Sequence, residues 1–374
     1  MKVAYFSDSF AKRERFGLSR YSHEMFHQLR ALNVDVVPTS PHNEFNEPWP
    51  EWLVHSGFRQ IPIKRAYLAS LWSVAPFPRI ERWIPAVDIV HSIDIDYEIR
   101  STAPWVATFH DLGPLTRPEF FSKAHPWLLR NYVRAAVRRA DALLCVSEAT
   151  AQELRDIAGV PLGDRLVVVS EGVGAEFFTA PPADTMRGLA TRPVEDVPYF
   201  LFTGSMNPRK NLVRVVRAFA SIADRIPHQL VLTGTLGWDS SELAKELAQS
   251  SAAAKIVCPG YVSNDQLRAL YAGSSAFLFP SLYEGFGLPI LEAMAAGCPV
   301  LTSNLSSMPE VAGDAALLVD PASERELGDA MVALAEDAGL RKRYVEAGLA
   351  RARLFSWASC AAHTLRIYQQ VARS

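Results

Sequence analysis

Residues 276–300 read AFLFPSLYEGFGLPILEAMAAGCPV, and this stretch decides how the chain is interpreted. It begins with an apolar run typical of a buried strand and continues through a glycine-rich turn into a helix. Pro289 marks the helix start, because proline is favoured in the first helical turn. Gly285 and Gly287 let the backbone approach a ligand, and N–H groups at a helix start attract phosphate. The stretch therefore predicts a strand–turn–helix unit with an anion-binding turn.

Two glutamates, Glu284 and Glu292, flank this turn. Glu284 follows the strand end and Glu292 lies about one turn into the helix, so we expect both carboxylates to face one crevice. Carboxylates accept hydrogen bonds from sugar or ribose hydroxyls, and here they stand beside a turn suited to an anion. The pattern predicts a sugar-nucleotide site. The structural alternative is an ordinary strand–turn–helix whose glutamates are solvated.

The stretch resembles the E-x7-E signature of retaining glycosyltransferases with the GT-B fold, family 4 in particular. The matching segments are Glu284-Gly285-Phe286-Gly287-Leu288-Pro289, Glu292-Ala293-Met294-Ala295 and Gly297-Cys298-Pro299-Val300. The resemblance implies two Rossmann-like domains facing across a cleft. It also implies that Glu284 holds the donor sugar, that Glu292 binds the ribose, and that the turn from Gly285 to Leu288 holds the diphosphate.

The rest of the chain fits this architecture, because short apolar strands alternate with amphipathic helices from end to end. A proline-rich break at residues 180–197 separates two such series, and 374 residues suit two domains. We expect doubly wound parallel-sheet domains over residues 1–180 (acceptor side) and 197–356 (donor-binding). Residues 357–374 should form a helix, which by the resemblance packs back on the first domain. The expected strands are Val3–Ser7, Val34–Pro38, Ile89–Ser92, Trp105–His110, Ala142–Ser147, Leu166–Val169, Tyr199–Thr203, Leu230–Thr233, Lys255–Cys258, Ala276–Phe279 and Val300–Ser303.

Composition excludes several classes of protein. A formal net charge of −2 argues against a nucleic-acid partner, which needs a basic excess. The four cysteines lie far apart without C-x-x-C spacing, so we expect small buried hydrophobes in a reducing compartment. The chain enters a strand at once, and no apolar run reaches the roughly 18 residues that span a bilayer. We expect a cytoplasmic protein that at most rests on the inner face of a membrane.

The second series of strands opens with FTGSMNPRKNL at residues 202–212, where two cations start a helix after a glycine turn. Arg209 is suited to forking onto phosphate oxygens, and Lys210 to acting as a point charge beside a departing nucleoside diphosphate. This segment resembles the family's glycine turn with Arg-Lys-Asn, which implies donor contacts from Gly204 and Ser205 too. Ser205 stands where many relatives carry arginine, which leaves Arg209 and Lys210 as the main cations. The alternative is a basic pair on the surface.

In the first domain, Gly17 opens a helix and His110 ends a strand. The resemblance implies that Gly17 lies near the diphosphate or sugar and that His110 contacts the donor sugar. The alternatives are a plain turn and a histidine bonded to a neighbouring carbonyl. Asp111 is expected to orient His110 or to cap the next helix. Glu171-Gly172-Val173-Gly174 departs from the family's usual Asn-Gly-Val-Asp turn, and no ligand role is assigned to Glu171.

Three other motifs have separate interpretations: one donor contact, one helix cap and one rejected metal motif. Tyr261 and Val262 follow a strand. We expect them to lie near the nucleobase and to contact it through backbone groups. Ser147 before an acidic residue is typical of a helix N-cap. Asp94-Ile95-Asp96 matches the D-x-D metal motif of the other major glycosyltransferase fold, but it lies in the first domain, far from the donor motifs. We therefore expect no metal site.

Residues Lys123–Arg139 include five cations and no acid. Arg130, Arg134 and Arg138 share one helix face, so the segment fits a helix packed on its sheet with a basic solvent face. The alternative is an interfacial helix that meets anionic lipid or a polyprenyl-diphosphate-linked acceptor.

The resemblance implies a hexosyltransferase that moves a sugar from a nucleotide-sugar donor to a glycan or lipid-linked glycan acceptor, with retention and without cofactor or metal. Glu284, His110, Lys210 and Arg209 would be its catalytic residues. The glycine motifs look most like bacterial mannosyltransferases of O-antigen and exopolysaccharide assembly, so GDP-mannose is the expected donor; UDP-sugars and other GDP-sugars are alternatives. A non-catalytic sugar-nucleotide-binding protein should have lost the glutamates or Lys210, and all are present. A dinucleotide oxidoreductase would need G-x-G-x-x-G after a strand, which is absent.

Overall fold

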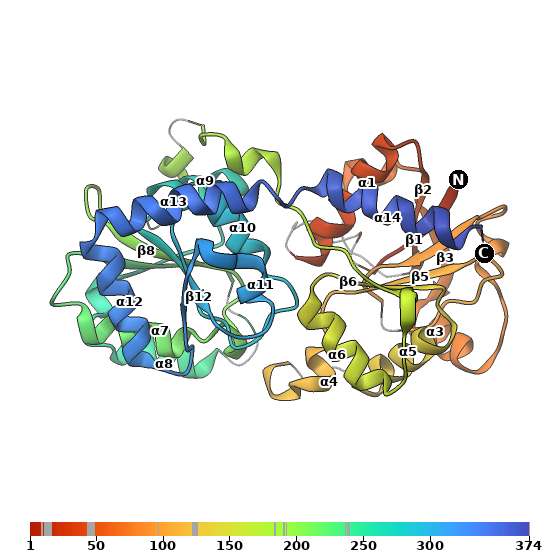
Figure 1. Cartoon of the computed structure of the whole chain (residues 1–374), viewed down its shortest axis with the longest axis horizontal. Helices are drawn as coiled ribbons and strands as arrows, with labels where there is room; N and C mark the ends of the chain where they lie inside the picture. Colours follow the sequence, from red (N-terminus) through yellow and green to blue (C-terminus); the bar gives the residue numbers. More distant parts are fainter. Residues whose placement is uncertain are drawn as a thin grey trace. The chain divides into compact units, whose positions relative to one another are not determined.

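The computed structural model describes residues 1–373 apart from residues 9, 11–16, 43–48, 96, 122–125, 183–184, 190, 192, 236 and 238–239. The chain forms two compact units (Figure 1). The first comprises Met1–Pro118, Lys123–Gly172 and Trp357–Ser374, and the second comprises Glu119–Ser122 and Val173–Ser356. The division at Gly172 precedes the proline-rich break. Residues up to Ala180 pack with the second unit because Arg268 donates to the carbonyl oxygens of Thr179 (2.9 Å) and Ala180 (3.1 Å).

The first unit is built on a seven-stranded sheet in the order β3-β2-β1-β4-β5-β6-β7, with every neighbouring pair parallel. Its strands are β1 (Lys2–Phe6), β2 (Asp35–His42), β3 (Arg59–Lys64), β4 (Ile89–Ser92), β5 (Trp105–Phe109), β6 (Ala142–Cys145) and β7 (Leu166–Val168). Its helices are α1 (Leu18–Ala31), α2 (Glu51–Val54), α3 (Arg65–Val74), α4 (Gly113–Thr116), α5 (Pro126–Arg139), α6 (Glu148–Ala158) and α14 (Trp357–Val371). The strand order reverses between β1 and β4, which is the doubly wound arrangement.

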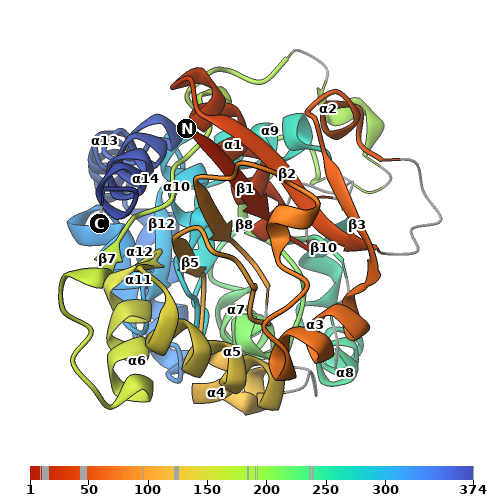
Figure 2. The ribbon, with the colours of Figure 1, turned by 90° about the vertical axis from the view of Figure 1, so that its right-hand side faces the viewer.

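Side chains of β1 alternate between the two faces of this sheet. Ala4 and Phe6 belong to the core that also contains Leu68 of α3, Val133 of α5 and Leu154 of α6. Figure 2 shows these three helices along the same side of the first unit. The buried face of each helix thus covers one side of the sheet.

The other side of the sheet is covered by α1 and by α14, which comes from the far end of the chain. Within this layer, the hydroxyl of Tyr368 lies 2.6 Å from Nδ1 of His91, and Nε2 of His91 lies 2.7 Å from Oγ1 of Thr108. Burial, and secondarily His110, lowers the pKa of His91 to about 3, so the ring is neutral. The ring of Trp357 also lies 5.8 Å from that of Tyr21. These contacts fasten α14 to the first unit.

The second unit contains a six-stranded parallel sheet in the order β10-β9-β8-β11-β12-β13. Its strands are β8 (Tyr199–Thr203), β9 (Gln229–Thr233), β10 (Ile256–Gly260), β11 (Ala276–Phe279), β12 (Val300–Ser303) and β13 (Leu317–Val319). Its helices are α7 (Leu212–Ile222), α8 (Ser241–Gln249), α9 (Asn264–Gly273), α10 (Leu288–Ala295), α11 (Met308–Ala312), α12 (Glu324–Glu336) and α13 (Ala338–Ala352). Here the order reverses between β8 and β11. The predicted fold class, two doubly wound Rossmann-like domains, is confirmed, although β3 and β13 were not predicted.

The predicted helix cap at Ser147 is present in the structure. Ser147 accepts a hydrogen bond from the Thr150 N–H at 3.0 Å, which confirms that it caps α6.

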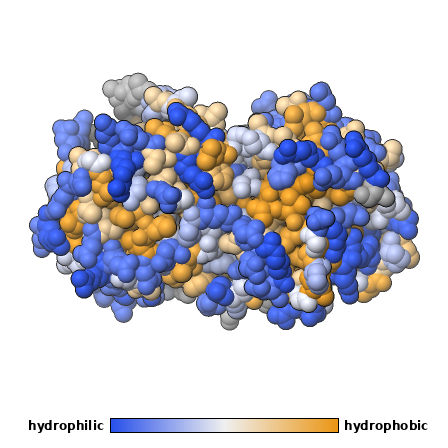
Figure 3. All heavy atoms as spheres, in the orientation of Figure 1, coloured by the Kyte–Doolittle hydropathy of each residue, from blue (hydrophilic) through white to orange (hydrophobic). Residues whose placement is uncertain are grey.

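Cys145, Cys298 and Cys360 are buried as expected, but Cys258 is exposed, because it points outward from the edge strand β10. Figure 3 shows hydrophilic side chains over most of one face of each unit, with apolar ones in smaller areas among them. Within the described part of the chain, no helix has the length and apolar character needed to cross a membrane.

Candidate active site

Glu284 and Glu292 are both buried side chains of the second unit, at 8% and 6% exposure. Glu284 lies in the turn after β11, and Glu292 lies inside α10. Gly287 caps α10 with φ 112°, a conformation that residues with a Cβ rarely adopt. The predicted strand–turn–helix unit is therefore present, and the alternative of two solvated glutamates is wrong.

Glu284 is held by both predicted cations. Lys210 Nζ donates to Oε1 at 2.6 Å, and a guanidinium nitrogen of Arg209 lies 2.5 Å from Oε2. The Lys210 side chain is 8% exposed and that of Arg209 is 24% exposed, so the two do not form a surface pair. Three charged groups from turns 74 residues apart thus form one cluster, which we call the Glu284 cluster.

The turn after β8 presents these cations through its backbone. Pro208–Lys210 form one turn of 3-10 helix, and Asn211 follows with φ 62°. The side-chain amide of Asn211 donates to the carbonyl oxygens of Pro280 (3.2 Å) and Pro321 (2.7 Å). Asn211 therefore ties the cationic turn to the loops after β11 and β13. Its left-handed backbone explains why asparagine, which tolerates that region, follows the Arg-Lys pair.

Two serines that the sequence did not single out fix the Glu284 turn. Ser306 Oγ donates to the carbonyl oxygen of Glu284 at 2.5 Å, and Ser307 Oγ lies 3.0 Å from the same oxygen. Ser307 also donates to the carbonyl oxygen of Phe286 at 2.7 Å. Ser306 has φ 55°, a strained value for a non-glycine residue. The position of Ser307 before a helix suggests a cap, but its hydroxyl bonds the active-site turn instead.

The electrostatics of the Glu284 cluster favour an anionic ligand. Burial alone would raise the pKa of Glu284, but Arg209 and Lys210 together lower it to about 2. Burial, assisted by Arg209 and opposed by Glu284, lowers the pKa of Lys210 to about 8. At neutral pH the cluster therefore holds two positive charges and one negative charge. Lys210 Nζ also lies 4.3 Å from the centre of the Phe279 ring, which further favours its charged form.

Glycines end three neighbouring strands of the second sheet. Gly204, Gly234 and Gly260 all have positive φ and follow or finish β8, β9 and β10. A Cβ on Gly234 would lie 2.0 Å from the carbonyl oxygen of Gly204, so the two backbones pass in close contact. Gly204 was predicted, whereas Gly234 was not. A glycine at the end of an apolar strand could have identified Gly234, because the same pattern occurs at the ends of β8, β9 and β10.

The remaining predicted donor-binding residues follow these strand ends or surround the Glu284 turn. Ser205 is exposed, Tyr261 is 50% exposed and Val262 is buried. Phe286 is buried with its ring 6.0 Å from that of Phe355, and Leu288 is buried at the start of α10. Their contacts with a donor stay a prediction.

His110 and Gly17 belong to the first unit. His110 directly follows β5, and its Nδ1 lies 3.0 Å from Oε1 of Glu171. Gly17 caps α1 with φ 47°, which favours glycine, while the residues before it, 11–16, lie outside the described residues. Asp111 Oδ1 accepts from the N–H of Gly113, the first residue of α4, at 3.2 Å, whereas the N-cap position of α4 is Leu112. Nδ1 of His110 thus contacts the carboxylate of Glu171, to which the sequence assigned no role.

Asp94 takes part in a structural hydrogen bond: its Oδ1 accepts from the Asp8 N–H at 2.9 Å. Asp96, the other acid of the D-x-D match, lies outside the described residues. Over the described ranges, no three His, Cys, Asp or Glu side chains gather as a metal-binding group.

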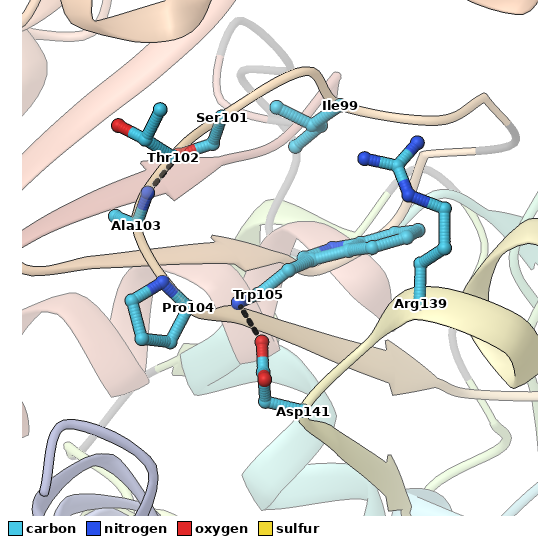
Figure 4. A pocket seen from close by; sticks show the side chains of 8 residues that line it. All are labelled: Ile99, Ser101, Thr102, Ala103, Pro104, Trp105, Arg139 and Asp141. Atoms are coloured by element: carbon cyan, nitrogen blue, oxygen red, sulfur yellow. Dashed lines mark hydrogen bonds between the residues drawn. The ribbon is translucent and has the colours of Figure 1, made fainter. Parts of the chain in front are cut away.

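A pocket of about 230 Å³ lies at the amino ends of β5 and β6, whereas His110 follows the carboxyl end of β5 (Figure 4). Trp105, the first residue of β5, donates its N–H to Oδ2 of Asp141 at 2.8 Å, and Arg139 lines the same pocket. Because His110 follows the other end of β5, this pocket is not part of the predicted site.

Comparison with known proteins agrees with these features. Residues 190–351 match the family described as Glycosyl transferases group 1, and residues 17–177 match Glycosyltransferase Family 4. The O-antigen chain mannosyltransferase B of Escherichia coli is 33% identical over 266 residues, which cover 71% of this chain and 70% of that protein.

Solved structures support the fold over the whole chain. Sucrose-phosphate synthase (tll1590) from Thermosynechococcus elongatus superposes with a TM-score of 0.76 at 20% identity, covering 100% of both chains. Anabaena Alr3699/HepE, solved with UDP-glucose, has a TM-score of 0.72 at 17% identity and covers 100% of this chain and 98% of its own. The predicted GT-B fold and enzyme class, a glycosyltransferase, are confirmed. The chain belongs to glycosyltransferase family 4.

Proposed function

We propose that the protein is a retaining hexosyltransferase that moves mannose from GDP-mannose to a glycan or lipid-linked glycan in surface polysaccharide assembly. The observation that carries this proposal is the Glu284 cluster, in which two cations converge on a buried carboxylate. A diphosphate is attracted by the cations, and a sugar hydroxyl can donate to the carboxylate. Glu292 of the same unit is the predicted partner of the ribose, and His110 of the first unit keeps its predicted contact with the donor sugar.

The proposed reaction needs no covalent intermediate. The bond between the anomeric carbon and the phosphate oxygen breaks, and the acceptor oxygen forms a bond on the same face of the sugar. The acceptor proton passes to the departing phosphate oxygen. Arg209 and Lys210 stabilise the negative charge that develops there, usually the largest catalytic contribution. No cofactor or divalent metal takes part in this scheme.

The choice of donor rests on sequence similarity. The Escherichia coli relative is an O-antigen chain mannosyltransferase that is 33% identical over 266 residues. The glycine motifs of this chain also resemble those of bacterial mannosyltransferases. The Anabaena structure holds UDP-glucose, so a uridine donor is the main rival. A non-catalytic nucleotide-binding protein is the rival from another class.

A nucleotide panel separates these candidates. We expect GDP and GDP-mannose to raise the melting temperature by mass action, and UDP, ADP, UDP-glucose and UDP-N-acetylglucosamine to leave it unchanged. The shift should be the same with and without EDTA. A uridine-selective shift would overturn the donor, and an EDTA-sensitive one would overturn metal independence. Binding of GDP-mannose without transfer to any lipid-linked acceptor would favour the non-catalytic rival.

The acceptor side of the proposal includes contact with an anionic membrane surface. Arg130, Arg134 and Arg138 of α5 are exposed, and Trp127 at its start is 64% exposed. Arg134, Arg138 and Trp127 line a pocket of about 290 Å³ together with residues of α3. Exposed cations beside an exposed aromatic ring suit lipid headgroups or a polyprenyl diphosphate. Lys123, at the start of this basic segment, lies outside the described residues.

Vesicle sedimentation tests this surface. We expect the protein to sediment with phosphatidylcholine vesicles only when they also contain phosphatidylglycerol, and replacing Arg130, Arg134 and Arg138 with glutamine should abolish the binding. The control replaces three exposed arginines of the second unit, Arg325, Arg343 and Arg353. If both triple variants lose binding equally, total charge rather than α5 is responsible, and the alternative of a plain solvent face holds.

A further inference from the structure

His110 and Glu171 form a buried pair at the carboxyl edge of the first sheet. His110 follows β5, and Glu171 lies in the turn after β7, two strands along in the sheet. Their side chains are 11% and 7% exposed, and Nδ1 of His110 lies 3.0 Å from Oε1 of Glu171. A buried carboxylate needs a donor, and an ion pair or hydrogen bond to His110 supplies one. The pair therefore lies at the carboxyl ends of the strands, where doubly wound parallel sheets bind ligands.

The chemistry of this pair fixes which ring nitrogen carries the proton. A carboxylate only accepts hydrogen bonds, so Nδ1 of His110 must be the donor to Glu171. In the neutral ring, Nε2 is then an acceptor. This nitrogen is buried and has no hydrogen-bond partner among the described residues. A buried acceptor without a partner costs free energy of desolvation. A ligand that donates a hydrogen bond to Nε2 removes this cost and therefore binds more tightly.

A second contact limits rotation of the ring. Tyr21 of α1 packs edge-on against His110, with ring centres 4.5 Å apart and planes at 84°. Tyr21 is itself 1% exposed and fixed in the layer below α14, where its ring meets that of Trp357. Glu171 therefore sets the tautomer while Tyr21 limits the ring plane.

We propose that Glu171 is a positioning residue that holds His110 with Nε2 as acceptor for a hydroxyl group of the donor sugar. This inference rests on the proposed function. It assigns to Glu171 the orienting role that the sequence gave to Asp111, whose Oδ1 accepts from the Gly113 N–H. It also gives a physical role to the position where this chain has glutamate in its Glu171-Gly172-Val173 turn.

Nitrogen NMR of histidine-labelled protein tests the tautomer without any assay of activity. The His110 signals are identified by their loss in H110A. We expect wild-type His110 to carry its proton on Nδ1, and Glu171→Ala to give mixed tautomers. Glu171→Gln, whose amide oxygen still accepts from Nδ1, should keep more of the Nδ1 form than alanine does. Equal tautomer populations in wild type and E171A would overturn the inference.

Kinetics test the link to transfer. We expect E171A to lower kcat by about 10- to 100-fold, because small misplacements of a contacting group have effects of that size. E171Q should recover part of the loss, and E171A should have no further effect in an H110A background. The control is Glu176→Gln, an exposed carboxylate a few residues along. Normal E171A kinetics in an active enzyme would overturn the inference alone, whereas a wild-type protein with no transfer activity would overturn the proposed function and leave the tautomer result standing.

Discussion

Replacing Lys210 with methionine is expected to lower kcat/KM for sugar transfer by roughly 10²- to 10³-fold, the effect of losing one preorganised donor to a developing negative charge. Methionine keeps an unbranched side chain that can pack on the ring of Phe279, against which Lys210 lies at 4.3 Å. Arg209 remains paired with Glu284, so the buried carboxylate keeps one of its cations. The loss should therefore reflect the missing charge. Initial rates with the donor identified by the nucleotide panel measure it.

The matched control for this variant is Lys245→Met on the exposed side of α8, which should transfer sugar at the wild-type rate. Circular dichroism and urea midpoints of both variants check that the fold is retained. Wild-type activity in K210M would show that Lys210 does not stabilise the departing diphosphate.

Replacing Glu284 with glutamine is expected to lower the free energy of unfolding of the second unit by about 3 kcal/mol, because it leaves buried cations without their counter-charge. Lys210 would lose its 2.6 Å ion pair, and the amide would offer it only a neutral acceptor. Activity should fall in the same variant if Glu284 holds the donor sugar. Urea unfolding at pH 7, followed through the transition of the second unit, measures the stability change.

The control is Glu246→Gln, which removes the exposed pair between Glu246 and Arg217 at 2.8 Å. Exposed pairs contribute little, so its urea midpoint should equal that of the wild type. An E284Q protein as stable as E246Q would show that burial of the Glu284 cluster does not strengthen its ion pairs.

The same carboxylate makes stability depend on pH. The pKa of Glu284 is lowered on folding from 4.5 to about 2, so the folded state favours the ionised form. Its contribution is complete above pH 4.5 and is lost as the pH falls towards 2, by roughly 2–4 kcal/mol in all. The difference in stability between the wild type and E284Q should therefore shrink over this interval.

Much of the fold follows from sequence patterns that are local. The buried strands of both sheets are continuous apolar runs, and the predicted Tyr199–Thr203, Ala276–Phe279 and Val300–Ser303 match β8, β11 and β12 residue for residue. The two omitted strands lie at sheet edges. In β3, RQIPIK mixes charged residues and a proline with only one fully buried position, and β13 has three residues. Such strands are recruited by a neighbour rather than specified by their own periodicity.

The candidate site was likewise predicted only in part from the sequence. Glu284, Arg209 and Lys210 were predicted because glycine turns after strands mark them, but their mutual contacts join residues far apart in the chain. Ser306, Ser307 and Glu171 could not be selected from sequence, because serine and glutamate in loops are usually solvated. Only the tertiary fold buries Ser307 and Glu171 and brings the exposed Ser306 to the carbonyl oxygen of Glu284. Sequence thus identified the charged groups and missed the residues that hold them in place.

Helix α14 imposes an order on biosynthesis. A ribosome releases Met1–Gly172 early, yet Tyr368, the hydroxyl partner of buried His91, emerges only after the whole second unit. Until then α1 alone covers this face of the first sheet, and the apolar side chains that α14 would bury are open to chaperones or to other nascent chains. The first unit is accordingly completed only after the second, and a nonsense codon just before Trp357 would damage the amino-terminal unit.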